Sequence, residues 1–394
     1  MRAVLSFIAE RAVEDAPALV RPGGETMSFG TLGMAAAAVM QAVGARVGEV
    51  ARRVVGVAVD DAAGFVASVL AVLEAGGVVM PLDLRRGTAA LEVEAARARA
   101  LAVIVGDAAE DRLDVVAVDA SRRELSAEAC LILDAGGRHA VHGRVGLGLG
   151  VDAIARQIGL DAGSRVALVG PLAEPSVLMT ALATLRAGGA IVDGGAQVGG
   201  GVARVASGAM ADLLALAGTP LARVVLVGEG DVRELGAAFP AARIARALDT
   251  AEALRVAAAE GDAPMAPLPG VALWPSEEWV DVQAPTAMLG YLDDAEATRA
   301  VFGEREGKRF VRARPVGRVD EAALERAIAA TPGVREAAVL AVRDAAGERL
   351  YAFVAGDATA VPRHPARVVV LESLPHAGDG SVDRRALRRM AAVD

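Results

Sequence analysis

The chain has 394 residues, of which 54% are hydrophobic, and it carries a formal net charge of −9 with an isoelectric point near 5.2. A chain of this length and apolar content buries a large core and is expected to form two or more domains. The acidic balance argues against a nucleic-acid partner, because that kind of binding depends on clustered Lys and Arg.

The single cysteine, Cys130, excludes an internal disulfide framework and any metal cluster held by cysteines. The apolar stretch at residues 66–82 is interrupted by Glu74 and two glycines, whereas a membrane helix needs about 20 uninterrupted apolar residues. The first segment is acidic, unlike a secretory signal. We therefore expect a cytoplasmic protein without a membrane span.

Two segments of the large N-terminal region repeat one pattern: a β-branched run, a helix that ends in Ala-Gly-Gly, and a second strand. Short buried strands that alternate with helices predict an α/β fold, with two related layers of mostly parallel sheet covered by helices. The expected elements are a strand at 26–29 and a helix at 35–43; the first unit at 54–59, 65–74 and 78–82; strands at 103–105 and 131–133; the second unit at 166–169, 176–185 and 190–192; a helix at 203–217; and a strand at 224–227.

The last part of the chain changes character and predicts a small α+β domain. Pro315 is unfavourable within a helix, so the boundary is expected near it, which divides the chain into domains at residues 1–312 and 313–394. The expected elements are a helix at 321–330, strands at 337–342, 350–354 and 366–371, and a basic helix at 383–390.

Five segments, in order, resemble the motifs of adenylate-forming enzymes, the family of acyl-CoA synthetases, luciferases and nonribosomal adenylation domains. The closing one reads Leu374-Pro375 and then Gly380-Ser381-Val382-Asp383-Arg384, where the family has Leu-Pro and then Gly-Lys-hydrophobic-Asp-Arg. Pro332 to Val339 belongs with this closing match to the small C-terminal domain. The others are Phe65 to Asp83, Leu182 to Gly189, Val224 to Glu229, and Met288 to Phe302 with its Gly-Tyr and Thr-x-x-x-Phe. The resemblance spans nearly the whole chain and implies a two-domain adenylating fold.

The resemblance also implies four catalytic features, and the first is a loop rich in Gly, Ser and Thr, with a lysine, that wraps the ATP phosphates. The equivalent stretch, residues 133–143, has no hydroxyl and places Asp134 where phosphate would lie. Arg138, His139 and His142 remain as candidate anion ligands, but we favour a solvated loop. The two histidines are three residues apart, but a third metal ligand is not evident and no metal site is expected.

The second feature is the Tyr-Gly-Pro-Thr-Glu segment that meets adenine, phosphate and magnesium in the family. Here it aligns with Leu248-Asp249-Thr250-Ala251-Glu252, so only the glutamate remains. Glu252 is either a relic of the metal ligand or an ordinary exposed helix residue. With Gly228 and Glu229, these residues mark a degenerate nucleotide pocket.

The third feature is an aspartate that binds the ribose, and the fourth is a lysine that the small domain delivers to the phosphate. Pro315 takes the place of the aspartate in one alignment of residues 311–320, and in the alternative alignment the whole aspartate segment is missing. Ser381 replaces the lysine. Arg384 and Arg385 lie one helical turn away, and the only lysine, Lys308, matches a surface turn.

These losses favour a pseudoenzyme that needs no ATP or magnesium and acts as a binding or docking protein in natural-product or acyl metabolism. Its expected partners are a carrier protein, a partner biosynthetic enzyme, or a small carboxylic acid or acyl ligand. The alternative is a divergent acid ligase that uses ATP and magnesium, or an acyltransferase that takes a preactivated acyl group. The alternative needs Glu252, Arg138, His139 and His142 to converge on one cleft.

Overall fold

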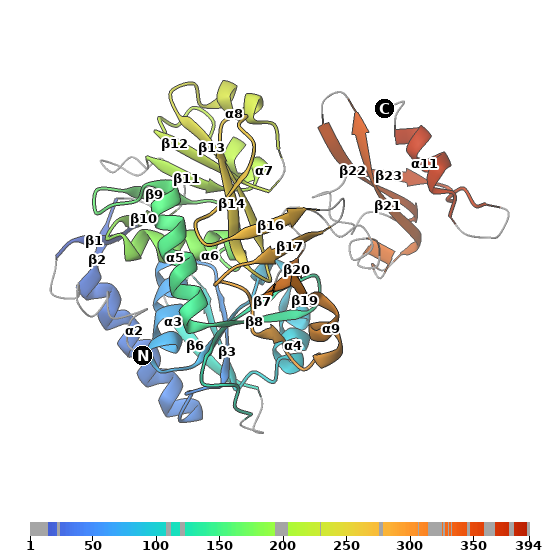
Figure 1. Cartoon of the computed structure of the whole chain (residues 1–394). Coiled ribbons are helices and arrows are strands. Elements are labelled where there is room, and N and C mark those ends of the chain that lie inside the picture. Colours follow the sequence, from blue (N-terminus) through green and yellow to red (C-terminus); the bar gives the residue numbers. More distant parts are fainter. Residues whose placement is uncertain are drawn as a thin grey trace. The chain divides into compact units, whose positions relative to one another are not determined.

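The computed structural model forms two compact units, residues 1–317 and 318–394 (Figure 1). The boundary expected between residues 312 and 313 falls inside strand β20 (Lys308–Ala313) of the first unit. The structure describes residues 15–21, 24–107, 112–118, 123–193, 204–228, 230–275, 279–305, 307–313, 325, 328–329, 331, 333–344, 347–357, 367–377 and 382–391.

The expected α/β class is confirmed, because the first unit contains two large sheets built mainly from parallel strands that alternate with helices. The nine-stranded sheet has the order β15 (Ala266–Pro267), β14 (Leu254–Glu260), β13 (Arg243–Thr250), β12 (Arg223–Val227), β11 (Val205–Gly208), β9 (Arg165–Leu168), β10 (Ala190–Val192), β1 (Pro17–Val20) and β2 (Thr26–Ser28).

The second sheet has seven strands, and its central four are parallel. Antiparallel strands close both of its sides. Its order is β18 (Gly290–Tyr291), β8 (His139–Gly143), β7 (Ala129–Asp134), β4 (Val78–Pro81), β3 (Val54–Val59), β5 (Ala102–Asp107) and β6 (Arg112–Ala117).

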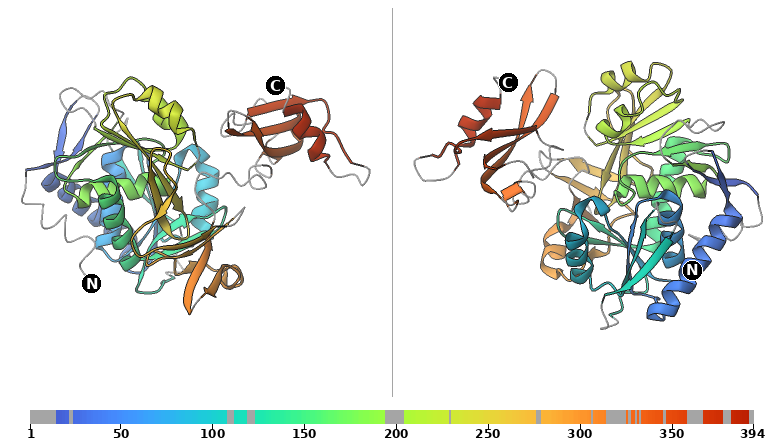
Figure 2. Two further views of the ribbon diagram at one scale, coloured as in Figure 1. Left: turned by 45° about the horizontal axis from the view of Figure 1, so that its top comes forward. Right: turned by 180° about the vertical axis from the view of Figure 1, so that it is seen from behind.

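One continuous core joins both sheets, because the same helices pack against strands of each (Figure 2). The outer faces of the two sheets have separate cores. The shared helices are α2 (Phe29–Val47), α3 (Ala62–Glu74), α5 (Arg144–Ile158) and α6 (Pro175–Arg186); the turn η1 (Leu84–Arg86) and α4 (Thr88–Arg97) lie on the seven-stranded side, and α7 (Met210–Leu214) and α8 (Val232–Ala238) lie on the nine-stranded side.

The repeated Ala-Gly-Gly sequence has the same geometry at the ends of α3 and α6. Gly76 and Gly188 have φ values of 76° and 81°, which a residue with a side chain rarely adopts. A Cβ on Gly77 or Gly189 would lie 2.8 to 3.0 Å from its neighbours. Each glycine pair therefore ends its helix and lets the chain turn directly into the next parallel strand.

A small four-stranded antiparallel sheet completes the first unit. Its buried face packs with the loop after β13 and with β8. Its elements, in spatial order, are β16 (Ala272–Pro275), β17 (Val280–Gln283), β20 and β19 (Phe302–Arg305), with the short helix α9 (Ala295–Val301) beside them.

The second unit holds a three-stranded sheet with the helix α11 (Arg384–Ala391) packed on it through Leu387 and Ala391. A backbone bridge joins His376 to Val382, so the ends of the closing signature lie side by side, although Ser381 itself is outside the described residues. The strands are β21 (Val334–Asp344), β22 (Gly347–Gly356) and β23 (Arg367–Leu371). Most of the helix expected at 321–330 also lies outside the described residues.

The helix expected at 203–217 is wrong over its first half. Residues 205–208 form β11, which pairs with β9 and β12 in the nine-stranded sheet, and only Met210–Leu214 is helical. Pairing with two neighbouring strands outweighs the helical preference of this alanine-rich segment. Within the described part of the chain, the helices are too short or too polar to cross a membrane.

Candidate functional site

The segment that aligns with the family's phosphate loop is a tight hairpin between β7 and β8. The N–H of Ala135 donates to the carbonyl of Arg138 at 2.7 Å, and the two residues between them, Gly136 and Gly137, have φ values of 67° and 85°. The turn therefore has two central residues with positive φ, as turns of type I′ require. Asp134 Oδ1 accepts the N–H of Gly137 at 2.8 Å, so a carboxylate already binds one of the few amides here.

The expectation of a solvated loop for the histidines is therefore wrong. Both lie on strand β8, where His139 is 6% exposed and His142 is fully buried. Residues three apart in a strand point to opposite faces of the sheet, so these two side chains diverge. The described residues contain no group of three or more His, Cys, Asp or Glu placed to hold a metal.

His142 is held in its neutral form by its surroundings. Burial lowers its pKa to about 4, although hydrogen bonds to the backbone of Ala251 and Thr286 act in the opposite direction. Its Nε2 lies 2.6 Å from the carbonyl oxygen of Ala251, to which a neutral ring donates. This histidine thus links β8 to the turn after β13 and is unavailable to a ligand in solution.

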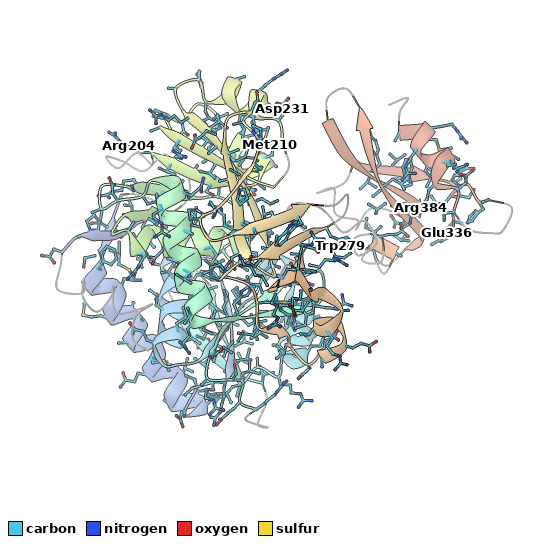
Figure 3. The ribbon with its side chains drawn as sticks, viewed as in Figure 1. Arg204, Met210, Asp231, Trp279, Glu336 and Arg384 are labelled. Atoms are coloured by element: carbon cyan, nitrogen blue, oxygen red, sulfur yellow. The ribbon has the colours of Figure 1, made fainter. Side chains whose placement is uncertain are left out.

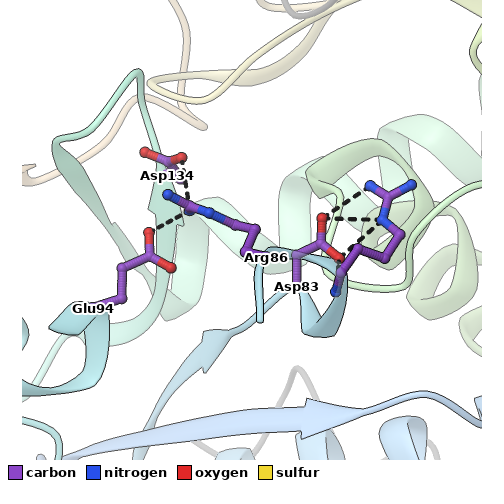
Figure 4. A network of polar contacts seen from close by, with 5 residues as sticks. Asp83, Arg86, Glu94 and Asp134 are labelled. Carbon is purple, nitrogen blue, oxygen red and sulfur yellow. Dashed lines mark hydrogen bonds and ion pairs between the residues drawn. The ribbon is translucent and has the colours of Figure 1, made fainter. Parts of the chain in front are cut away.

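Charged side chains that influence His139 belong to a network on the other face. Figure 4 shows Arg86, Glu94 and Asp134 of this network. Arg86 Nη1 lies 2.5 Å from Glu94 and 3.6 Å from Asp134, and Arg97 donates to the carbonyl of Gly137 at 3.0 Å. Burial lowers the pKa of His139, and the arginines reinforce this effect while Asp134 opposes it. The hairpin is thus held by arginines from η1 and α4.

Carboxylates also gather beside this network. Asp83 accepts two hydrogen bonds from Nε of Arg85 and one from its Nη2, as Figure 4 shows. Burial, followed by the charge of Asp249, raises the pKa of Glu174 at the start of α6, and Asp83 and Asp134 act in the same direction. Acidic groups from four separate elements therefore influence one another in this region.

Glu252 lies in the turn between β13 and β14 and is only 5% exposed, so the expectation of an exposed helix residue is wrong. The hydroxyl of Tyr291 donates to its Oε1 at 2.9 Å. Burial, together with the charge of Glu252, raises the pKa of that tyrosine. Arg138 lies over the Tyr291 ring at 5.8 Å and pairs with Asp294 at 3.3 Å.

Asp249 forms a buried ion pair instead of facing a nucleotide. Its two carboxylate oxygens accept from Nε and Nη2 of Arg255 at 2.7 and 3.1 Å, and the two side chains are 4% and 0% exposed. A bulge after Leu248 changes the strand register here. The neighbouring Thr250 is also buried, and its hydroxyl accepts the N–H of Ala253 at 2.9 Å.

The predicted candidates therefore do not form one cluster. Arg138 and Glu252 meet through Tyr291, and His142 reaches the carbonyl beside Glu252, but His139 faces the opposite side of the sheet. Gly228 follows β12 with a φ of 88°. Glu229, Pro315 and Ser381 lie outside the described residues.

Sequence reasoning missed the partners that hold these side chains. Arg255 stands opposite Asp249 across a hairpin, and opposite charges at such a spacing are a usable signal. Tyr291 lies in a motif that was noticed, but its contact with Glu252 joins segments 39 residues apart. Nothing in the sequence around Arg86 and Glu94 indicates that they form an ion pair beside the hairpin.

No protein-family model and no curated protein sequence matches the chain. Solved structures of adenylate-forming enzymes match it over nearly its whole length. MatB from Rhodopseudomonas palustris is 18% identical, with a TM-score of 0.61 and 98% of each chain covered. The amide bond synthetase McbA from Marinactinospora thermotolerans is 21% identical, with a TM-score of 0.63, and the match covers 98% of this chain and 99% of the McbA chain.

NpsA from Klebsiella oxytoca, solved in complex with 3-hydroxyanthranilyl-AMSN, is 15% identical, with a TM-score of 0.65 and 100% of each chain covered. These identities are low, and the likeness establishes the fold. The chain has the fold of adenylate-forming enzymes, as its motifs predicted.

Proposed function

We propose that this chain is a homologue of adenylate-forming enzymes that has lost ATP-dependent adenylation and acts by binding or docking. The turn between β7 and β8 is the observation that carries the proposal. A phosphate-binding loop works by presenting several free amides and hydroxyls to the phosphates. Here the loop is reduced to Gly136 and Gly137, and the carboxylate of Asp134 accepts one of its amides.

Electrostatics supports the same conclusion. ATP carries several negative charges, and the surroundings of the hairpin contain carboxylates whose own arginine partners are already engaged. Burial raises the pKa of Glu174, and the charges of Asp249, Asp83 and Asp134 add to this effect while Arg85 opposes it. An anionic ligand would meet repulsion from these carboxylates; among the described arginines of this network, Arg97 is the one that donates to a backbone carbonyl, that of Gly137, without an ion pair to a described residue.

The residues that align with the adenine and magnesium segment do not fit that role either. Leu248 supplies no aromatic ring, Asp249 is bound to Arg255, and Glu252 accepts from Tyr291. A magnesium ion prefers several oxygen ligands in octahedral geometry. Because these carboxylates take part in internal contacts that hold the fold, we derive no step through ATP or magnesium.

We propose that this binding role belongs to acyl or natural-product metabolism, with a carrier protein, a partner biosynthetic enzyme, or a small acyl or carboxylic-acid ligand as the partner. Two solved structures with the same fold support this proposal. One is a nonribosomal peptide synthetase bound to AMP and glycine, and the other is NpsA in complex with 3-hydroxyanthranilyl-AMSN. The enzyme alternative needs four side chains to converge, and His139 faces away from the others.

Two measurements on the full chain test this proposal. Calorimetric titration with ATP or AMP and magnesium is expected to give no saturable heat, and a pyrophosphate-release screen over carboxylic acids is expected to give no turnover. Magnesium-dependent ATP binding with turnover would overturn it. If any activity appears, the E252A and H142A variants, with E92A as the exposed control, decide whether the candidate cluster carries it.

A further inference from the structure

The four-stranded sheet has one apolar face and one polar, aromatic face. Val282 and Val311 pair across β17 and β20 on the apolar face and are fully buried. Because side chains alternate along a strand, the residues next to Val282 and Val311 in their own strands point to the opposite face. We call that opposite face the basic face; it comprises Trp274, Asp281, Arg312, Phe310, Gly303, Arg305 and Lys308.

Aromatic rings make a platform on the basic face. Phe310 lies directly over Gly303, where an added Cβ would come within 2.4 Å of the ring. The guanidinium of Arg305 lies 5.0 Å from the centroid of the Trp274 ring. Stacking on a ring holds a guanidinium in place and leaves its N–H donors able to bind a carboxylate.

The end of the basic face carries two cations. Arg305 and Lys308 are directly opposite each other in the pairing of β19 with β20, and both are exposed. Like charges in this position destabilise a hairpin. Neither forms an ion pair with any residue that the structure describes, whereas Arg312 on the same face pairs with Asp281 at 2.8 Å. An external anion would remove the repulsion.

We propose that the basic face docks an acidic segment of a partner protein, with carboxylates on Arg305 and Lys308 and apolar atoms on the Trp274 and Phe310 rings. This rests on the proposed docking function. Charge complementarity selects the partner, because Arg305 and Lys308 form no ion pair with a described residue and therefore attract acidic side chains to this face. Trp279, labelled in Figure 3, directly precedes β17.

A fluorescein-labelled hexaglutamate peptide is the probe, and anisotropy at low ionic strength is the measurement. The variant R305Q/K308Q removes both cations of the basic face. The matched control, R46Q/R156Q, removes two exposed arginines from α2 and α5. Affinity is expected to fall roughly tenfold in the first variant, because each exposed charge contact contributes a factor of about three, and to change less than twofold in the control.

The variant W274A tests whether binding depends on the aromatic ring as well as on charge, since it leaves every cation in place and removes only the ring under Arg305. It is expected to weaken binding about threefold. Equal losses in R305Q/K308Q and R46Q/R156Q, or no binding by the unaltered chain, would overturn the proposal. The outcome is independent of ATP: turnover would remove the pseudoenzyme proposal and leave the peptide result standing.

Discussion

The buried pair of Asp249 and Arg255 makes a sharp prediction about stability. Two charged hydrogen bonds of 2.7 and 3.1 Å join side chains that are almost completely buried, and Gln157 supplies one further contact to the arginine at 3.2 Å. The variant D249L removes both bonds and leaves the guanidinium buried with one neutral partner. Breaking one side of such a pair costs about 3–5 kcal/mol.

Urea unfolding followed by tryptophan fluorescence measures this cost in the first unit, which contains both tryptophans. R255M should cost a similar amount, and the double variant D249L/R255M should cost much less than the sum of the two, because no buried charge is left alone. The control is E124Q, which breaks an exposed pair with Arg52 and a longer contact of 3.7 Å with Arg53, and it should cost less than about 1 kcal/mol. Single costs below that of the control, or simple additivity, would refute a structural role for Asp249.

Three further predictions concern a histidine, a turn and the small unit. The pKa of His142 is about 4 in the folded chain against about 6.5 unfolded, so the unfolded chain takes up a proton first as pH falls, and the free energy of unfolding should drop by about 3 kcal/mol between pH 6.5 and 4. Urea unfolding across that range should show a smaller drop in H142Q. An unchanged pH profile in H142Q would contradict the reasoning. G137V places a branched side chain at a φ of 85° and should cost about 2 kcal/mol, whereas G44A, within α2 and in open space, should stabilise by about 0.5–1 kcal/mol; thermal unfolding of the two variants checks the opposite signs. Arg384, labelled in Figure 3, donates to Glu325 at 2.6 Å and to the carbonyl of Val339 at 3.0 Å, so it anchors α11 to β21. R384A should therefore destabilise the second unit by about 1.5–3 kcal/mol and R385A by less than about 0.5 kcal/mol, measured by hydrogen exchange of β21. Equal effects of the two variants would contradict this anchoring role.

Much of the fold follows from local sequence signals. The strand at Val54–Val59 and the repeated Ala-Gly-Gly turns were predictable, because a β-branched run and a glycine at a helix end act over a few residues. The histidines on β8 were not. Three glycines surround them and suggested a loop, yet Gly136 and Gly137 form the turn itself and leave residues 139–143 free to pair with β7.

The site depends on contacts that no local pattern contains. Tyr291 reaches Glu252 because β18 joins β8 at the edge of the seven-stranded sheet, and Arg86 reaches Asp134 because η1 follows β4 beside β7. Comparison with the motifs indicated where this sequence departs from them. It could not indicate that Asp249 and Glu252 are bound to internal partners, since that follows from how the two sheets bring distant segments together.

The central claim is most directly tested by calorimetric titration of the purified full chain with ATP and magnesium. The account predicts no saturable heat, because the hairpin at Gly136 and Gly137 offers no phosphate cradle and Asp134 repels the ligand. A saturable binding heat that disappears when magnesium is removed would contradict it.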